Sequence, residues 1–321
     1  MSLFDHIKKK PDVKEEPNKN QPAVDIADTQ ASDSPDTFSS DNQTFSSEPE
    51  NQQFNNTDSE NNSSESAFSF ETNVKEVSQD PAPLEARRFS VGIDLGTTHC
   101  VLSYADITDS DDGEFSQQVM AIPQLTSPGE VEESFQLPSF LYQAHEAELA
   151  EGSSALPWNA KPDYLVGEIA RNMGSKTPIR LVSSAKSWLC HAGVDCKSPI
   201  LPADAPEEVE RVSPFQATTA YLQHIRDAWQ NRHPDAPLEE QDLVITVPAS
   251  FDPAARELTV ESARAVGLDQ AILLEEPQAA LYSWIEKSQG DWRKQATCGD
   301  IILVIDVGGG TTDLSLIAVT E

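Results

Sequence analysis

The sequence predicts an α/β protein, on three observations. An apolar strand that ends in an aspartate, turns through glycine and two threonines and returns as a second strand occurs at 91–104 and again at 303–319. The aspartates of the two copies, Asp94 and Asp306, lie 212 residues apart, which suggests a duplicated fold with one ligand between its halves. Between the copies, strand-like apolar runs alternate with helical patterns, which is typical of α/β proteins.

Residues 1–88 have a different composition from the rest of the chain. They contain 18 Asp and Glu against 8 Lys and Arg, among long stretches of Ser, Asn, Gln and Pro. Such a segment cannot bury enough apolar surface to offset the entropy lost on ordering. We therefore expect a disordered acidic tail at 1–88.

Charge and composition also exclude several classes of function. The net charge is −32, of which −22 lies in 89–321, and this argues against a basic surface that binds nucleic acid. No stretch approaches the ~18 apolar residues of a membrane span, and no secretory signal is visible. Four cysteines without such a signal favour a reduced, cytoplasmic protein. We expect neither nucleic acid nor membrane as a partner.

The patterns place helices and strands along the chain. Gly and Pro punctuation, capping residues and apolar periodicity define each element. In chain order they predict a hairpin at 89–105, a strand at 117–122, a loop-rich segment at 123–165, helices at 178–192, 214–229, 253–267 and 278–287, and strands at 243–247, 272–274, 303–307 and 314–319.

The helix predicted at 178–192 carries an unusual lysine. Thr177 is its expected N-cap, with Pro178 in the first turn and Gly193 just after its end. Lys186 is the only charged residue inside its broad apolar arc. It is either a lysine that snorkels from the edge of the apolar stripe or a cation directed into a site.

Two strand-to-helix units follow. The β-branched run at 243–247 ends at Pro248 and leads into a helix that begins at Asp252-Pro253, with Arg256 in its first turn. By residue type alone, Arg256 is either a solvated helix residue or a group that faces a ligand at the strand end.

Three carboxylates occupy equivalent positions. Glu276 lies where a strand passes into a helix, as Asp94 and Asp306 lie where strands enter their turns. Because ligands of open α/β sheets bind outside the carboxyl ends of strands, the three are expected to converge, unless any of them caps a helix or turn. Carboxylates suit hydrated Mg²⁺, and the backbone N–H groups of a glycine-rich turn can close on an anion.

Several pieces of the chain, in their order and spacing, resemble the nucleotide-binding domain of the heat shock protein 70 (DnaK) family, an actin-like, ribonuclease H-like fold. These pieces are Ile93-Asp94-Leu95-Gly96-Thr97-Thr98, Ala185-Lys186, Val247-Pro248-Ala249 through Arg256, Glu276-Pro277 with Ala279-Ala280, and Asp306-Val307-Gly308-Gly309-Gly310-Thr311-Thr312-Asp313. The resemblance covers roughly 90–321 and is weakest from 110 to 175.

The resemblance implies a domain plan. Residues 89–298 would form the first lobe, with an inserted subdomain at about 123–211, and 299–321 would begin the second lobe with its first hairpin. The chain would then be an N-terminal fragment, in which we expect weak nucleotide binding and little hydrolysis.

It also implies a reaction and its residues. The reaction is hydrolysis of ATP to ADP and phosphate by in-line attack of water. In such a reaction the protein mainly positions the reactants and stabilises charge. Around hydrated Mg²⁺ the resemblance places Asp94, Glu276 and Asp306. Against the phosphates it places Gly96, Thr97, Thr98, Gly308, Gly309, Gly310 and Thr311. In catalysis it implicates Lys186, Glu276, Asp306 and Thr311, and as a relay to the domain surface Pro248 and Arg256.

By the same resemblance the partners are unfolded polypeptide clients, a J-domain co-chaperone and a nucleotide-exchange factor. His99-Cys100 and Glu275 depart from the family's more usual residues and indicate a divergent branch. Two alternatives remain. One is a sugar or acetate kinase of the same superfold, and the other is an actin-like scaffold or degenerate chaperone domain that binds nucleotide without hydrolysing it.

Overall fold

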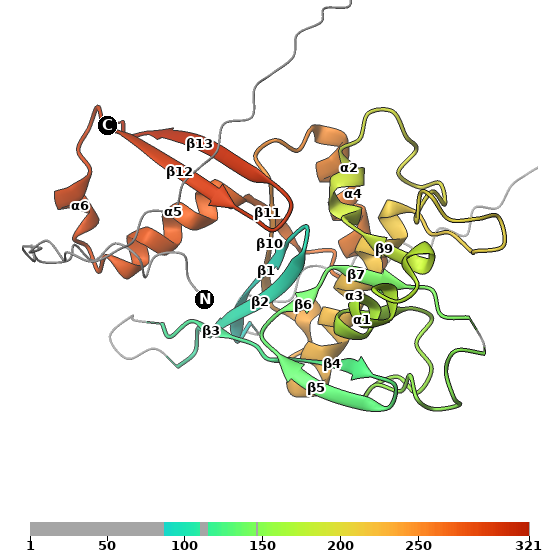
Figure 1. Ribbon diagram of the computed structural model, residues 1–321. Coiled ribbons are helices and arrows are strands. Elements are labelled where there is room, and N and C mark those ends of the chain that lie inside the picture. The colour runs from blue at the N-terminus through green and yellow to red at the C-terminus, as the bar shows by residue number, and fades with distance from the viewer. Residues whose placement is uncertain (1–86, 110–114, 146, 321) are drawn as a thin grey trace, which may run out of the picture. The chain divides into compact units, whose positions relative to one another are not determined.

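The computed structural model describes residues 87–109, 115–145 and 147–320 (Figure 1). The disordered tail predicted at 1–88 lies outside these residues except for its last two. Within them the chain is a mixed α/β structure, as the sequence predicted. No helix of the described residues is both long and apolar enough to cross a membrane.

The main sheet has six strands and contains the first predicted hairpin. Its order is β11-β10-β1-β2-β3, with β6 also paired to β2. Strand β1 pairs antiparallel with β2 and parallel with β10, which in turn lies parallel to β11. The bounds are β1 (Phe89–Leu95), β2 (His99–Asp106), β3 (Gln118–Val119), β6 (Leu137–Pro138), β10 (Asp242–Val247) and β11 (Ile272–Glu275).

Two smaller sheets occupy the segment between β3 and α2. Strands β4 (Ile122–Ser127) and β5 (Glu130–Ser134) form a hairpin. Strands β8 (Leu165–Val166), β7 (Phe140–Tyr142) and β9 (Leu181–Ser183) form a three-stranded sheet in that order. The single strand predicted at 117–122 is therefore divided between β3 and β4.

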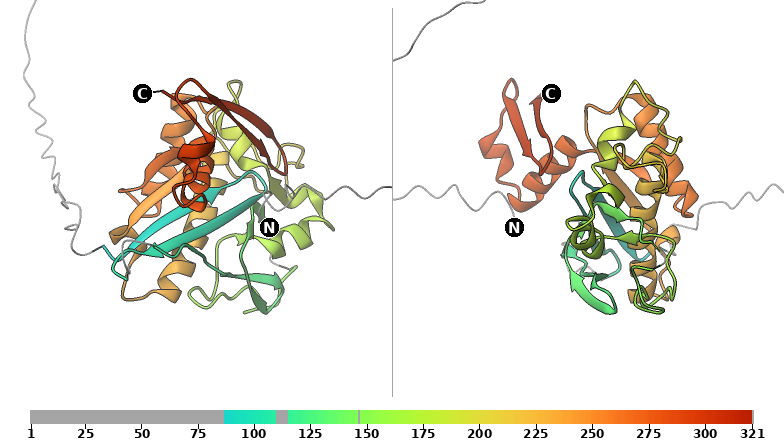
Figure 2. Two further views of the ribbon diagram at one scale, coloured as in Figure 1. Left: turned by 90° about the vertical axis from the view of Figure 1, so that its left-hand side faces the viewer. Right: turned by 45° about the vertical axis from the view of Figure 1, so that its right-hand side comes forward.

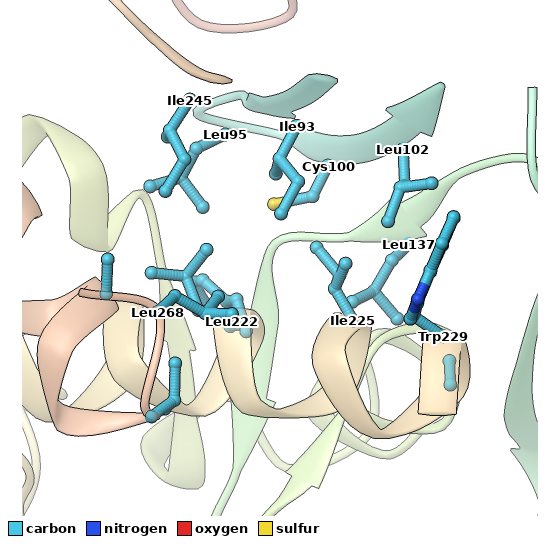
Figure 3. Packing of buried hydrophobic residues seen from close by; sticks show 14 of the residues in the cluster. Ile93, Leu95, Cys100, Leu102, Leu137, Leu222, Ile225, Trp229, Ile245 and Leu268 are labelled. Carbon is cyan, nitrogen blue, oxygen red and sulfur yellow. The ribbon is translucent and has the colours of Figure 1, made fainter. Parts of the chain in front are cut away.

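Helices pack on the main sheet through apolar faces. Ser213 caps α3 (Pro214–Arg232) with a complete capping box, and Asp252 caps α4 (Pro253–Ala265). Figure 3 shows Leu222, Ile225 and Trp229 of α3 directed at side chains of β1, β2 and β10. The other helices are α1 (Glu168–Gly174), α2 (Ala185–Leu189), α5 (Glu276–Lys287) and α6 (Trp292–Gln295).

The prediction of one continuous helix at 178–192 is wrong. A 3₁₀ turn at Pro178–Arg180 leads into β9, which pairs with β7, and buries Val182 in the core. Ser184 then adopts a left-handed conformation with φ of 55°, which a helix cannot contain, and α2 begins only after it. Pairing with β7 was available to this segment, whose β-branched Val182 enters the core, and that tertiary pairing overrides the helical periodicity.

The second predicted hairpin forms its own two-stranded sheet. Strands β12 (Ile301–Val307) and β13 (Thr312–Ala318) pair antiparallel, with Asp306 opposite Asp313. The two similar hairpins, β1–β2 and β12–β13, are both visible in Figure 2. Several apolar side chains of the second are exposed: Ile301, Leu303, Ile305, Val307, Leu314 and Leu316.

Candidate functional site

The two glycine-rich turns lie against each other. Residues 96–98 connect β1 to β2, and 308–311 connect β12 to β13. A Cβ atom added to Gly309 would lie 2.6 Å from Oγ1 and 2.7 Å from Cγ2 of Thr98, and one added to Gly310 would lie 3.3 Å from Cγ2 of Thr97. Only glycine therefore allows the second turn to approach the first this closely. The structure thus brings together the two turns that the sequence singled out.

Each turn also holds its own shape. The Gly308 N–H donates to the carbonyl of Thr311 at 2.9 Å, which closes the second turn. In the first turn, a Cβ atom on Gly96 would meet the carbonyl oxygen of His99 at 2.2 Å. The backbone is therefore compact at both turns, and the Gly308 N–H is taken up by the second turn itself.

Three carboxylates surround the meeting point. Asp94, at the end of β1, accepts a hydrogen bond from Thr246 Oγ1 at 2.9 Å. Burial raises the pKa of Asp306, and the negative charges of Asp94 and Asp313 raise it further. Burial likewise raises the pKa of Glu276, and the charges of Asp94 and Asp306 contribute, against the lowering effect of Lys186. Like charges are thus held near one another, as the sequence predicted for strand ends.

The carboxylates are not packed tightly enough to ligate a metal ion by themselves. Among the described residues no three His, Cys, Asp or Glu side chains are grouped as a metal site. The charge of Asp94 nonetheless acts on the pKa of both Glu276 and Asp306, and that of Asp306 on the pKa of Glu276, which places the three in one electrostatic neighbourhood. Water molecules between ion and carboxylates would fit this looser arrangement, and Mg²⁺ keeps several waters in proteins.

Lys186 is a buried cation. Its side chain is 7% exposed, and Nζ lies 2.5 Å from Oε1 of Glu276. Nζ also lies 5.8 Å from the ring centroid of Phe251, over its face. A lysine that snorkels to solvent is therefore excluded, and its charge is directed to the carboxylates at the strand ends. A small cleft of about 90 Å³ adjoins these groups, with Glu276, Asp306 and Asp313 in its lining.

The residues predicted as a relay are connected to this ion pair through Phe251. The Arg256 Nε donates to the carbonyl of Phe251 at 3.1 Å, and its Nη2 pairs with Oε1 of Glu275 at 2.7 Å. The carbonyl of Pro248 accepts from the Phe251 N–H at 3.1 Å. Phe251 thus contacts Arg256 through its carbonyl and Lys186 through its ring, so a contact path joins α4 to the site.

Ser139 is a site residue that the sequence patterns missed. Its Oγ donates to the carbonyl of Gly96 at 2.7 Å, and its backbone N–H donates to the carbonyl of Thr98 at 2.8 Å. The Ser139 carbonyl in turn accepts from the buried hydroxyl of Tyr221 at 3.1 Å. Ser139 therefore clamps both ends of the first turn. The available signal was one small polar residue inside the apolar run 137–142.

Ser139→Ala should lower the free energy of unfolding by ~1–2 kcal/mol, because the carbonyl of Gly96 loses its donor in a buried setting. Ser183→Ala, at an exposed serine of β9, is the matched control. Urea denaturation of both variants measures the difference. Equal stability of the two variants would show that the Ser139 hydroxyl does not hold the turn.

His99 gives the first turn a neutral neighbour. Its Nδ1 lies 3.2 Å from Thr98 Oγ1, within hydrogen-bond distance. Burial lowers the pKa of His99, and the positive charge of Arg171 lowers it further, against a raising effect of Glu168. The imidazole beside Thr98 is therefore uncharged at neutral pH.

The comparisons with known proteins agree with the sequence motifs. A family model described as Hsp70 protein matches residues 153–321, which include Lys186, Glu276 and Asp306. The chain is 30% identical over 261 residues to a chaperone protein HscA homolog of Pseudomonas aeruginosa, and 30% identical over 264 residues to chaperone protein HscA of Proteus mirabilis. A HscA homolog of Haemophilus influenzae is 29% identical over 252 residues.

Each alignment covers 77% of this chain and 35% of the relative, so the chain spans about a third of the length of the curated relatives it matches. The family model itself covers more than half of the chain. The resemblance drawn from the motifs is thereby confirmed, and the chain belongs to the Hsp70 protein family.

Proposed function

We propose that this chain carries the ATP-binding and ATP-hydrolysing machinery of a DnaK-like molecular chaperone, built on an actin-like, ribonuclease H-like fold. The observation that supports this most is the contact of the two turns, where a Cβ on Gly309 would lie 2.6 Å from Thr98 Oγ1. Two anion-binding turns that face each other, with carboxylates and a buried lysine beside them, suit a nucleotide polyphosphate better than any ligand of one turn alone.

The proposed domain plan follows the sheets. The first lobe is 89–298 and contains the main sheet, and its inserted subdomain, about 123–211, includes two smaller sheets. The second lobe begins at 299–321, where β12 and β13 form a separate sheet. In actin-like proteins such a division places a nucleotide between lobes, and the meeting of the two turns supports that plan here.

The phosphates would be held by local groups. The chain's net charge of −32 repels a polyphosphate, so binding depends on backbone N–H groups aimed at the ligand. In the first turn the N–H groups would come from Gly96, Thr97 and Thr98. The hydroxyls of the two threonines would add further donors. In the second turn the N–H groups would come from Gly309, Gly310 and Thr311, while the Gly308 N–H closes the turn on the carbonyl of Thr311.

Asp94, Glu276 and Asp306 would hold Mg²⁺ through water. The fit rests on the raised pKa of Glu276 and Asp306, which burial causes first and the neighbouring negative charges increase, because a cation relieves the repulsion between like charges. When bound, the ion supplies charge neutralisation for the transferred phosphoryl group.

In hydrolysis a water molecule attacks the γ-phosphorus in line with the leaving ADP oxygen, and phosphate and ADP result. Lys186 would place its Nζ beside the transferred group and stabilise the charge that spreads over its oxygens. Glu276, which holds Lys186 at 2.5 Å, and Asp306 would orient the attacking water, while Thr311 would fix the phosphate end.

Pro248 and Arg256 would report the state of the nucleotide to the surface. Phe251 contacts both Lys186 and Arg256. A movement of Lys186 toward or away from Glu276 would therefore shift Phe251 and, through it, Arg256 at the start of α4. Such a relay is a two-state element biased by the γ-phosphate.

Mg²⁺ should stabilise the chain at neutral pH and not below the ordinary Asp pKa of 3.8. A raised pKa in the folded state means that the stability which protonated Asp306 and Glu276 contribute is lost as pH rises through their folded pKa values. Above that window the carboxylates repel each other, and Mg²⁺ relieves the repulsion. Melting temperatures with and without Mg²⁺ measure this at both pH values.

Asp306→Asn should remove most of that Mg²⁺ effect and stabilise the metal-free chain at neutral pH. Asp269→Asn, at an exposed carboxylate, serves as the control and should change neither quantity. An Mg²⁺ effect that is equal in both variants would contradict the assignment of Asp306.

Titration calorimetry with MgATP tests the proposed function. Saturable binding that weakens on chelation of Mg²⁺ is the expected result, and absence of binding would refute it. Phosphate release in the absence of any added acceptor separates an ATPase from a sugar or acetate kinase. It is measured with a longer form of the protein that hydrolyses ATP. Sedimentation with and without ATP tests the filament alternative.

The partners remain proposals as well. Unfolded polypeptide, a J-domain co-chaperone and a nucleotide-exchange factor are the partners that a DnaK-like ATPase implies. The cytoplasmic location and the lack of nucleic-acid and membrane partners stay predictions from the sequence.

A further inference from the structure

A pair of cysteines lies at the end of the helix that carries Lys186. Cys190 follows the last residue of α2 and is exposed, and Cys196 lies six residues later and is partly buried. Cys190 Sγ donates to the carbonyl of Ser187 at 3.3 Å. Cys196 Sγ lies 3.3 Å from the carbonyl of Trp188 and 3.6 Å from that of Leu189. Both thiols therefore contact the same final turn of one short helix.

A second observation concerns the chain between the two cysteines. Burial raises the pKa of Cys196, and the negative charges of Asp195 and Cys190 add to this effect. The intervening residues turn back on themselves, because the Val194 N–H donates to the carbonyl of His191 at 3.3 Å and the Gly193 N–H donates to its ring nitrogen. The chain thus turns back between the two cysteines, as a bridge that closes so short a loop requires.

We propose that Cys190 and Cys196 form a redox-active dithiol that closes to a disulfide under peroxide and thereby loosens α2 and the Lys186–Glu276 pair. The regulatory half of this proposal rests on the proposed ATP site, whereas the formation of the bridge does not.

The step is balanced with a peroxide as the oxidant. The exposed Cys190 thiolate attacks a peroxide oxygen, which breaks the O–O bond and gives a sulfenic acid and, after protonation, water. The Cys196 sulfur then attacks the Cys190 sulfur, the S–S bond forms, and hydroxide leaves and takes the Cys196 proton as water. Two thiols lose two electrons and two protons, and one hydrogen peroxide becomes two waters.

The other two cysteines do not fit this role. Cys100 is buried beside Ser139, and burial raises the pKa of Cys100 to about 12, which leaves the thiol unreactive. Cys298 is exposed, but it lies outside this loop, in the segment before β12. It is therefore a useful internal reference for an accessible thiol outside the pair.

Closure of the bridge removes hydrogen bonds from the end of α2. The last carbonyls of a helix lack intrahelical partners, and here the thiols contact those of Ser187, Trp188 and Leu189. A disulfide has no S–H to donate, so these contacts end on oxidation. Because α2 has only five residues, from Ala185 to Leu189, loss of its final turn loosens the backbone that positions Lys186 against Glu276.

Peptide mapping of the whole chain tests the bridge directly. Trypsin cuts after Lys186 and Lys197, so both cysteines fall in one peptide, 187–197. After treatment of the reduced chain with hydrogen peroxide, this peptide should be lighter by two hydrogen atoms and resist alkylation. Dithiothreitol should restore both alkylation sites. Cys190→Ser and Cys196→Ser should each abolish the mass change, and Cys298→Ser should leave it intact.

MgATP titration of the same samples tests the consequence. We expect oxidation to weaken binding on the order of tenfold in the wild type, through loss of a charge-assisted contact, and to have no effect in Cys196→Ser. Sulfinic acid at Cys190 with an alkylatable Cys196 would overturn the proposal, as would a bridge that leaves MgATP affinity unchanged. If the bridge forms but the reduced chain does not bind MgATP, the proposed ATP site fails and the dithiol stands.

Discussion

Lys186→Met should lower the rate of ATP hydrolysis by a factor on the order of 10² or more, because loss of one preorganised charge contact has effects of this size. It should weaken nucleotide binding by only about tenfold, as loss of a charge-assisted contact does. The structure gives this expectation its basis in the buried Nζ, 2.5 Å from Glu276 Oε1 and at the strand ends where the two turns meet. The measurement is the rate of single-turnover hydrolysis. It is made with a longer form of this protein whose wild-type rate is measurable.

Lys197→Met is the matched control. Lys197 also forms an ion pair, with Glu261 at 2.5 Å, but its side chain is 54% exposed. It should leave the rate unchanged. A Lys186→Met protein that hydrolyses ATP at the wild-type rate would show that this lysine has no part in the reaction.

The same substitution should also cost stability. Removal of one partner leaves Glu276 buried without its cation, which typically costs ~3–5 kcal/mol. Glu276→Gln in the Lys186→Met background should recover much of that loss, because the uncompensated charge is then gone. Chemical denaturation of the two single variants and the double variant gives the coupling energy, and a coupling near zero would contradict a buried pair.

Gly309→Ala should weaken MgATP binding by about tenfold to a hundredfold, because overpacking by one methyl group costs ~1–3 kcal/mol. The added Cβ would lie 2.6 Å from Oγ1 and 3.0 Å from Cβ of Thr98. Threonine is stiff at χ1, so the strain is relieved only when the two turns move apart. Equilibrium titration with MgATP measures the loss.

Gly308→Ala provides the control one residue away. A Cβ there would meet nothing closer than 3.4 Å, so the second turn would keep its place. Thr98→Ala combined with Gly309→Ala removes the two nearest atoms, and in that background the Gly309 substitution should cost less than it does alone. An equal loss from both glycine variants would mean that the turns do not depend on close contact.

Much of the fold followed from local pattern. Strands β1, β2, β10 and β11 and helices α3, α4 and α5 lie close to where their periodicity and caps placed them. Strands β1, β2 and β10 and helices α3 and α4 each bury side chains in the same core, and Leu273 of β11 packs against it. The positions of Asp94, Glu276 and Asp306 followed from the rule that ligand groups gather at strand ends.

The rest depends on partners distant in the sequence. Strand β9 exists because it pairs with β7, and no local signal in 181–183 names that partner. Strand β5 is polar and exposed along its whole length, so alternation could not reveal it. Ser139 contacts Gly96 and Thr98 only through tertiary structure, and a lone serine carries no pattern.

Amide hydrogen exchange with and without MgATP tests the central claim most directly. If the two turns hold one nucleotide between them, MgATP should slow exchange at 96–98 and at 308–311 together, and at α2 beside them. Protection of only one turn, or of neither while another surface is protected, would contradict the account.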